Sequence, residues 1–446
     1  MWDYQRHARA LPPVDPTINR YTGFMVGTTA VVSPCGKTLA VGYGNKITLW
    51  NATTGKPINL SHPIQTRHDI LAFSSDGRYI ASLTVPDTRY DGSPVISIWD
   101  AATGLSHCRL VITPTHKGSL EWLFFLSNDN RLVLSGLREE GEGQKFVVHI
   151  WGDATLGEPC TTATLPCISS RGVGFPSLLL SPDVLTAIIL KHTSTNAILH
   201  CRCRNSIEEQ FVPHALFNAA AFGIVDTFGA AVFSPSGRFF ASIPDHTGIL
   251  LQIRVWETKT WTEVGGPFET GKRWIGKGIP WGGNGYISFS PDDHLIRFTS
   301  MQDGAIWVWN IHTGSLVAGP WRGYDLRQGD RIIISSDGEK LVSISFGQLE
   351  MVRLWDTYGF CIGQAQEPVG GVGDFGDRTL IQNGWVKEEG NDSLLFWVPL
   401  EHRDKLWRPR NIAVIGVTPT KLDFRTFKYG REWGECIDKE YMANTG

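Results

Sequence analysis

The chain has 446 residues, of which 42% are hydrophobic and 19% are charged, with a formal net charge of −3. This composition provides ample material for a packed core and is unlike that of a disordered chain. A nucleic-acid-binding domain usually carries a strongly basic face, so the charge balance argues against nucleic acid as a partner.

Two features bear on where the protein resides. The amino terminus lacks the apolar stretch of a secretory signal, and no run of about 18 apolar residues occurs. The eight cysteines are dispersed, unlike the dense framework of a small secreted domain. We therefore expect a cytoplasmic protein with reduced thiols and no membrane contact, and a nuclear location stays open.

A tight-turn signal resembling Ser-Pro-Asp-Gly follows short apolar strands along much of the chain. The signals begin at Ser33, Ser74, Ser127, Ser181, Ser234, Ser290 and Ser335. Asp and Asn can hydrogen-bond their own backbone, and Gly accepts a positive φ. Each signal therefore predicts a hairpin between two strands.

A second repeated signal is a strand that ends in tryptophan. Apolar residues lie one and three positions before each tryptophan, so that the strand is apolar on both faces. Such a strand belongs to a sheet that packs between two others, as in the blades of a propeller. We assign a structural, packing role to Trp50, Trp99, Trp151, Trp256, Trp309, Trp355 and Trp397. Replacing one of them with Ala is expected to cost on the order of 3–5 kcal/mol.

The spacing of these signals predicts an all-β propeller with eight repeat units, eight blades being favoured and seven the alternative. A degraded fourth unit fills the gap between Trp151 and Trp256, with 198–201 as its tryptophan-type strand. The predicted segments are 1–24 before the propeller, 25–410 as the propeller, and 411–446 as an extension packed on its closure. Residues 373–446 are expected to be integral to ring closure, because they contain too many large apolar groups to leave exposed: Trp385, Phe396, Trp397, Trp407 and Trp433.

Three stretches allow the repeat to be compared with a known family: VVSPCGKTLAVGYGNKITLWNATTG, LAFSSDGRYIASL…ISIWDAATG and ISFSPDDHLIRFTSMQDGAIWVWNIHTG. They resemble WD repeats, and the resemblance covers about residues 25–400. It implies a β-propeller and a role as a protein-interaction scaffold. No Gly-His pair precedes any repeat, and only the sixth keeps Ser300, Asp303 and Trp309 in places that suit the family's buried hydrogen-bond network. The tryptophans are therefore expected to hold the blades mainly by packing.

The carboxyl end carries a second resemblance. The sequences NGWV at 383–386, LLFWVP at 394–399, LWRPR at 406–410 and LDF at 422–424 occur in order, followed by Gly430, Trp433 and Cys436. This order is similar to the end of WD-repeat proteins of basidiomycete fungi, many of which carry an upstream NACHT domain. The resemblance implies a sensor or scaffold role. The chain contains no NACHT domain, so it does not imply nucleotide-driven activity.

No motif in the chain predicts a catalytic, metal or cofactor site. The segment 266–273 is close to a P-loop, but Arg273 stands where Ser or Thr must hold Mg²⁺, and no helix start follows. His200, Cys201 and Cys203 lack a second ligand pair for zinc. We therefore expect a non-catalytic interaction module without cofactor, metal or nucleotide. The alternative is a hydrolase or oxidoreductase with a site in the central channel.

Two predicted connections between blades combine the residue types that are enriched at binding hot spots. Residues 269–286 form a long glycine-rich connection, and the next connection lies one repeat later. The candidate protein-binding residues are Arg273, Trp274, Trp281, Trp321, Arg322 and Tyr324. The competing interpretation is that Trp274 and Trp281 fold back to cover a blade.

Overall fold

The computed structural model describes residues 29–66, 68–84, 93–112, 120–125, 131–140, 143–151, 161–166, 177–181, 186–190, 197–202, 212–218, 231–243, 250–273, 285–290, 292–300, 305–321, 331–335, 339–345, 351–356, 379–382, 384–388, 394–408 and 410–422. Within these ranges the regular structure is β-strand except for the short helix α1 (Leu400–Arg403). No helix in this part of the chain is long and apolar enough to cross a membrane.

Antiparallel sheets built from consecutive strands repeat along the chain. The first contains β1 (Thr29–Val32), β2 (Thr38–Tyr43), β3 (Lys46–Asn51) and β4 (Pro57–Ile58), and β5 (Ile64–Gln65) also pairs with β3. The second contains β6 (Ile70–Phe73), β7 (Tyr79–Thr84), β8 (Val95–Asp100) and β9 (Ser106–Val111). The third contains β10 (Leu120–Phe125), β11 (Leu132–Glu140), β12 (Gly143–Trp151) and β13 (Thr161–Pro166).

The next sheets follow the same order. The fourth contains β14 (Ser177–Leu180), β15 (Thr186–Leu190), β16 (Ala197–Arg202) and β17 (Val212–Asn218). The fifth contains β18 (Ala231–Phe233), β19 (Phe239–Ser242), β20 (Leu250–Glu257) and β21 (Phe268–Arg273), and the sixth contains β22 (Gly285–Phe289), β23 (Leu295–Ser300), β24 (Ile306–Asn310) and β25 (Leu316–Trp321). The fourth sheet confirms the degraded repeat, because β16 takes the place of the tryptophan strand.

The seventh sheet departs from this order. It contains β26 (Arg331–Ile334), β27 (Lys340–Ser345) and β28 (Met351–Asp356), but its fourth strand is β32 (Asn411–Ile415). The intervening chain forms a separate three-stranded sheet of β29 (Thr379–Gln382), β30 (Trp385–Glu388) and β31 (Leu394–Trp397). The boundary expected at residue 410 therefore falls directly before a strand of the seventh sheet.

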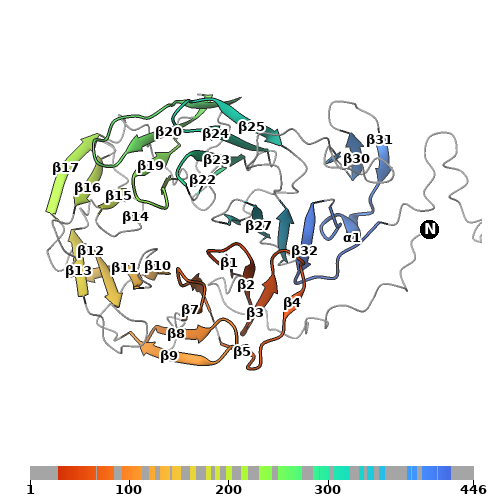
Figure 1. The fold of residues 1–446 in the computed structure, drawn as a ribbon, viewed down its shortest axis with the longest axis horizontal. Coiled ribbons are helices and arrows are strands. Elements are labelled where there is room, and N and C mark those ends of the chain that lie inside the picture. The colour runs from red at the N-terminus through yellow and green to blue at the C-terminus, as the bar shows by residue number, and fades with distance from the viewer. Residues whose placement is uncertain are drawn as a thin grey trace, which may run out of the picture.

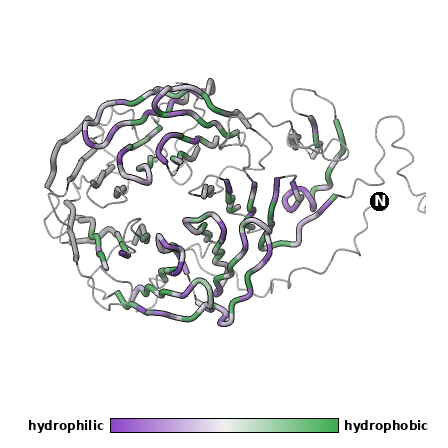
Figure 2. The backbone as a smooth tube through the Cα atoms, viewed as in Figure 1, coloured by the Kyte–Doolittle hydropathy of each residue, from purple (hydrophilic) through white to green (hydrophobic). Residues whose placement is uncertain are grey.

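The sheets with four or more strands stand around a common centre, with the first strand of each nearest to it and the fourth outside (Figure 1). Hydrophobic residues are concentrated in the strands and hydrophilic ones in several of the turns (Figure 2). This radial arrangement of four-stranded antiparallel sheets is a β-propeller. The all-β architecture expected from the repeats is confirmed at this level.

The serine of the repeated turn has a structural task. In five of the turns its Oγ accepts a hydrogen bond from the backbone N–H five residues later, at 2.9–3.1 Å, and the serines are Ser33, Ser74, Ser234, Ser290 and Ser335. The carboxylate of Asp76 also accepts from the Ser74 hydroxyl at 2.6 Å. The first-to-second strand turns are thus closed by their own polar side chains.

Apolar side chains join each sheet to its neighbours. One core cluster combines residues of the fifth and sixth sheets, including Phe239, Phe268 and Phe298. Others join the second sheet to the third and the first to the second. A further cluster joins Leu39 and Trp50 of the first sheet to residues of β27, β28 and β32. The first sheet therefore packs directly on the seventh.

At three junctions between neighbouring sheets, a glycine of one sheet lies close to a backbone carbonyl oxygen of the other sheet. A Cβ at Gly104 would clash with the carbonyl oxygen of His62 in the preceding sheet's outer segment, and one at Gly314 would clash with that of Gly265. At the start of the chain, a Cβ at Gly55 would clash with the carbonyl oxygen of Ile412 in β32. Thus Ile412 of β32 contacts the first sheet in the same way that His62 of the first sheet contacts the second and Gly265 of the fifth contacts the sixth.

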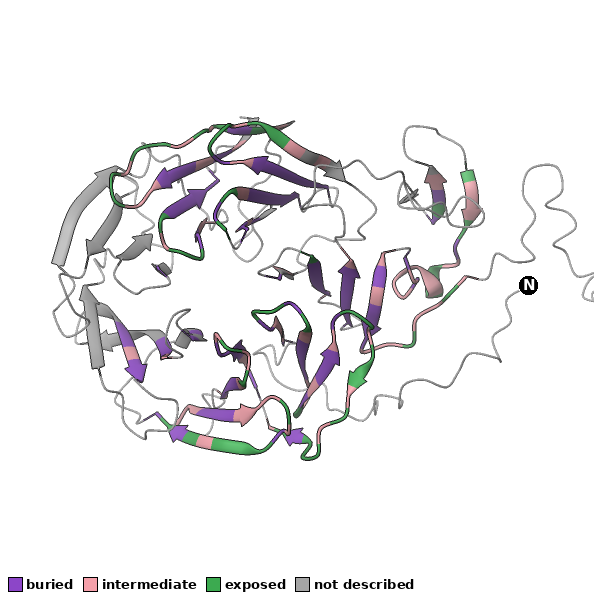
Figure 3. Cartoon of the chain, in the orientation of Figure 1, coloured by how far each residue is buried: buried purple, intermediate pink, exposed green. Residues whose placement is uncertain are grey.

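The eighth predicted unit corresponds to the three-stranded sheet, which lies beside the ring in Figure 1 and not between the first and seventh sheets. The expectation that its tryptophans are buried is wrong for two of them, because Trp385 is 39% exposed and Trp397 is 46% exposed. On this side of the sheet the guanidinium of Arg403, from α1, lies over the Trp397 ring. Exposed residues on β31 and on the outermost strand β9 are visible in Figure 3.

Candidate functional site

Two of the candidate binding residues lie in described strands. Arg273 is the last residue of β21, paired with Leu250, and Trp321 is the last residue of β25, paired with Ile306. Both strands are the outermost of their sheets, and these sheets share one core cluster. Arg273 and Trp321 therefore occupy equivalent positions on neighbouring sheets.

The antiparallel order fixes the side of the ring on which these two residues lie. The serine turns join first strands to second strands, and a second set of turns joins third strands to fourth. Because strand direction alternates, a fourth strand ends on the side opposite both sets of turns. Arg273 and Trp321 thus lie on one side of the ring, at the start of the connections to the next sheets. Trp274, Trp281, Arg322 and Tyr324 lie outside the described residues.

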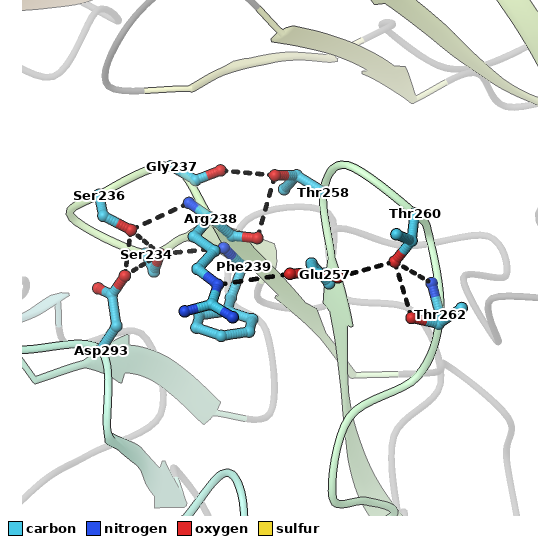
Figure 4. A network of polar contacts seen from close by, with 10 residues as sticks. All are labelled: Ser234, Ser236, Gly237, Arg238, Phe239, Glu257, Thr258, Thr260, Thr262 and Asp293. Carbon is cyan, nitrogen blue, oxygen red and sulfur yellow. Dashed lines mark hydrogen bonds and ion pairs between the residues drawn. The ribbon is translucent and has the colours of Figure 1, made fainter.

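A polar network fixes the two sheets that carry these residues. Asp293 stands in the sixth sheet's serine turn with φ of 61°, in the place that Gly36, Gly77 and Gly237 fill elsewhere. Its carboxylate accepts hydrogen bonds from Ser234, at 3.0 Å, and from Ser236 of the fifth sheet (Figure 4). Asp tolerates this left-handed conformation better than most residues. The network joins the sheets on the side opposite Arg273 and Trp321.

The structural tryptophans differ in environment. Trp50, Trp151, Trp256, Trp309 and Trp355 are buried, Trp99 is half-buried, and Trp397 is exposed. Three of them also donate a hydrogen bond from Nε1: Trp50 to Thr48 at 3.1 Å, Trp99 to Ser82 at 3.2 Å and Trp355 to Ser343 at 2.9 Å. In these three, hydrogen bonding accompanies the packing that the sequence predicted.

Polar groups in the third-to-fourth-strand turns are also engaged in structure. The side-chain oxygens of Asn51, Asp100 and Asn310 each accept two backbone N–H bonds from the turn that follows. The hydroxyl of Thr103 adds a third bond to Asp100 at 2.7 Å, and this bond is the main reason that the pKa of Asp100 is lowered. These carboxylate and amide groups hold turns closed.

One buried histidine is exceptional. His68 precedes β6 and is fully buried, and neither ring nitrogen has a hydrogen-bond partner among the described residues. A Cβ on Gly42 would collide with the imidazole and crowd the hydroxyl of Thr29. Burial lowers the pKa of His68, and the neighbouring Asp69 carboxylate opposes this. Burial inside the junction of the first two sheets therefore disfavours the protonated imidazole.

The structure bears on the ligand motifs weighed from the sequence. Residues 268–273 of the P-loop-like segment form strand β21, whereas a P-loop needs a helix to begin there and direct its amides at phosphate. Within the described ranges, no group of three or more His, Cys, Asp or Glu side chains is arranged to hold a metal ion. His200 and Cys201 lie in β16, and Cys203 lies outside the described residues.

A buried arginine escaped the sequence analysis. Arg353 of β28 donates to the carbonyls of Leu406, at 2.8 Å, and Asp404, at 2.6 Å, and to Oδ1 of Asn411 at 2.9 Å. Asn411 begins β32, so these bonds fix the segment that brings the fourth strand to the seventh sheet. A charged residue inside MVRLWD, otherwise a buried strand, was the available signal.

No family model matches the chain, and no curated protein matches it by sequence. Among solved structures, a chain of the mitotic checkpoint complex is 16% identical to this chain, over 75% of this chain and 90% of that one, with a TM-score of 0.45. The β-propeller domain of Myceliophteria thermophila Cps50 (Swd1) is 12% identical over 74% and 97%, with a TM-score of 0.43. The dihydro-heme d1 dehydrogenase NirN is 12% identical over 75% and 65%, with a TM-score of 0.41. Likenesses of this size assign neither function nor partner to the chain.

Proposed function

We propose that this chain is a non-catalytic protein-recognition module that binds its partner at the side of the propeller where β21 and β25 end. The supporting observation is the equivalent placement of Arg273 and Trp321 on two sheets that share a core. Arg and Trp are enriched at hot spots because each buries much area on contact. The connections that begin there add Trp274, Trp281, Arg322 and Tyr324 to the proposed surface.

The contacts that join the two sheets support this role. The shared core and the Asp293 network, which lies on the opposite side, hold the two sheets together. A surface that is organised before binding loses less entropy when a partner docks. A non-catalytic role also fits the use of the described serine, asparagine and aspartate side chains within turns.

We further propose that the propeller has seven blades and closes between the first and seventh sheets. Gly55 lies against the carbonyl oxygen of Ile412 in β32. The same kind of contact joins the first sheet to the second and the fifth sheet to the sixth. On this proposal the propeller extends through residue 415, and β29–β31 form an accessory sheet inserted in the seventh blade. The resemblance of the carboxyl end to fungal NACHT-associated WD-repeat proteins supports a sensor or scaffold role inside the cell.

The test is a comparative affinity purification of tagged full-length proteins with quantitative mass spectrometry. Wild type and Lys259→Ala should retain the same protein, whereas Arg273→Ala and Trp321→Ala should lose most of it. Lys259 is a matched control, because it is an exposed cation in a turn on the opposite side of the fifth sheet. A partner retained equally by all four proteins would place recognition elsewhere.

A further inference from the structure

The accessory sheet divides its side chains between two unlike faces. Val386 is opposite Phe396 in the register, and on this face Val386 is buried with Val398 and Leu406. Successive side chains in a strand point to opposite faces. The other face, which we name the tryptophan face, carries Trp385 opposite Trp397. Lys387 lies on it two residues after Trp385, and a register shift between Val386 and Lys387 places Leu394 opposite Lys387.

The tryptophan face is apolar and open. Trp385 is 39% exposed, Trp397 46% and Leu394 52%. All three are among the large hydrophobic residues that are exposed in the described part of the chain. Apolar side chains gathered in this way mark a surface that another segment covers.

Cations border this face. The guanidinium of Arg403 lies over the Trp397 ring at 5.1 Å from its centroid, and its Nε donates to the Val398 carbonyl at 2.8 Å. Lys387 lies on the same face, opposite Leu394. An occupant should therefore combine large apolar side chains with acidic ones.

The described chain ends at this same sheet. Leu422 packs against the cluster of Val386, Val398 and Leu406, and Lys421 lies over the Trp407 ring at 4.0 Å. Residues 423–446 therefore start beside the accessory sheet. This segment can extend roughly 80 Å at most, far enough to reach either face. It supplies the aromatic residues Phe424, Phe427, Tyr429, Trp433 and Tyr441. Its acidic residues are Asp423, Glu432, Glu435, Asp438 and Glu440, of which all but Asp423 follow the last of the closely spaced basic residues Arg425, Lys428 and Arg431, and Lys439 is the remaining basic residue.

We propose that residues 423–446 of the same chain bind the tryptophan face of the accessory sheet. Aromatic side chains of the segment pack on Trp385 and Trp397, and its acidic side chains lie near Lys387 and Arg403. This contact does not involve Arg273 or Trp321, and it can be tested separately from partner recognition.

Hydrogen exchange of the full-length protein, followed by mass spectrometry, tests the contact. In the wild type, amides in 423–446 should be protected. In the double variant Trp385→Gln/Trp397→Gln, they should exchange roughly tenfold faster or more, as expected from losing two binding hot spots. The matched control is Leu105→Gln/Val111→Gln, which removes two apolar residues of similar exposure, 49% and 57%, from the second sheet. This control should leave 423–446 unchanged.

A second variant probes the contact from the other side. Trp433→Gln leaves the sheet intact and should speed exchange in 394–397, while β26–β28 stay unchanged. Unprotected amides in 423–446 of the wild type would overturn the proposal. So would unchanged exchange of this segment in both variants. If the double variant instead converts a dimer to a monomer on size exclusion without affecting 423–446, a second copy covers the face, and the proposal is wrong.

Discussion

Gly55 in the first sheet lies against the carbonyl oxygen of Ile412 in β32, so closely that a Cβ on Gly55 would clash with it. Residues 55 and 412 are far apart in sequence, yet this contact repeats the one made at two other junctions between neighbouring sheets. The first and seventh sheets therefore pack on each other in the same way as sheets that follow one another along the chain.

Gly55→Ala should destabilise the protein more than Gly77→Ala. Both glycines have similar positive φ values, 67° and 72°, so both changes carry the left-handed penalty of about 1–2 kcal/mol. The Cβ at residue 77 finds its nearest neighbour, a side-chain atom of Pro34, at 4.0 Å, whereas the one at residue 55 meets a backbone oxygen. Overpacking should cost a further roughly 1–3 kcal/mol at residue 55, measured by urea unfolding. Equal losses would argue against the closing contact.

Asp293→Ala should destabilise the protein by about 1.5–3 kcal/mol, because it removes the charged acceptor of Ser234 and Ser236. Asp293→Asn keeps an acceptor oxygen and a residue that tolerates positive φ, and should cost clearly less. A double-mutant cycle with Ser234→Ala, read by chemical denaturation, isolates the bond between the sheets. Strict additivity of the two changes would show that the two side chains do not interact.

Arg353→Met should loosen the attachment of β32. The change leaves the carbonyls of Asp404 and Leu406 and the Asn411 amide oxygen without their charged donor. Hydrogen bonds to charged groups contribute about 1.5–3 kcal/mol, so amides in 404–415 should exchange much faster. Arg238→Met, which changes an exposed arginine, serves as the control. Unchanged exchange in 404–415 would show that Arg353 does not hold β32 in place.

His68 should make stability fall in mild acid. Burial lowers its pKa in the folded protein, so the unfolded chain, with a pKa near 6.5, binds a proton more readily. Where the unfolded state binds more protons, stability rises with pH. The contribution is therefore fully present above about pH 6.5 and is lost as pH falls below it. Urea midpoints from pH 8 to pH 5 should fall less in His68→Gln than in the wild type, whereas parallel pH profiles would contradict this assignment.

The local elements could be predicted from the sequence because their signals are local. The serine of each described turn closes its own hairpin. In strands such as Ile253–Trp256, apolar residues one and three positions before the tryptophan indicate a buried strand. The same alternation in Leu394–Trp397 predicted a buried tryptophan, but Trp397 is exposed. Alternation indicates a strand and two faces, whereas burial depends on what packs against each face.

The pairing of β28 with β32 could not be predicted in this way. It joins residues separated by the whole accessory sheet, and it depends on the hydrogen bonds that Arg353 makes to 404–411. For the candidate site, composition selected Arg273 and Trp321 as candidates. Their equivalent positions at the ends of β21 and β25 became visible only with the sheet order.

The most direct test of recognition at this side of the propeller is calorimetry of the purified partner with full-length variants. Arg273→Ala and Trp321→Ala should each weaken binding roughly thirtyfold, the equivalent of about 2 kcal/mol, with little change in Tm. Lys259→Ala, on the opposite side, should bind like the wild type. Wild-type affinity in both Arg273→Ala and Trp321→Ala would contradict the account.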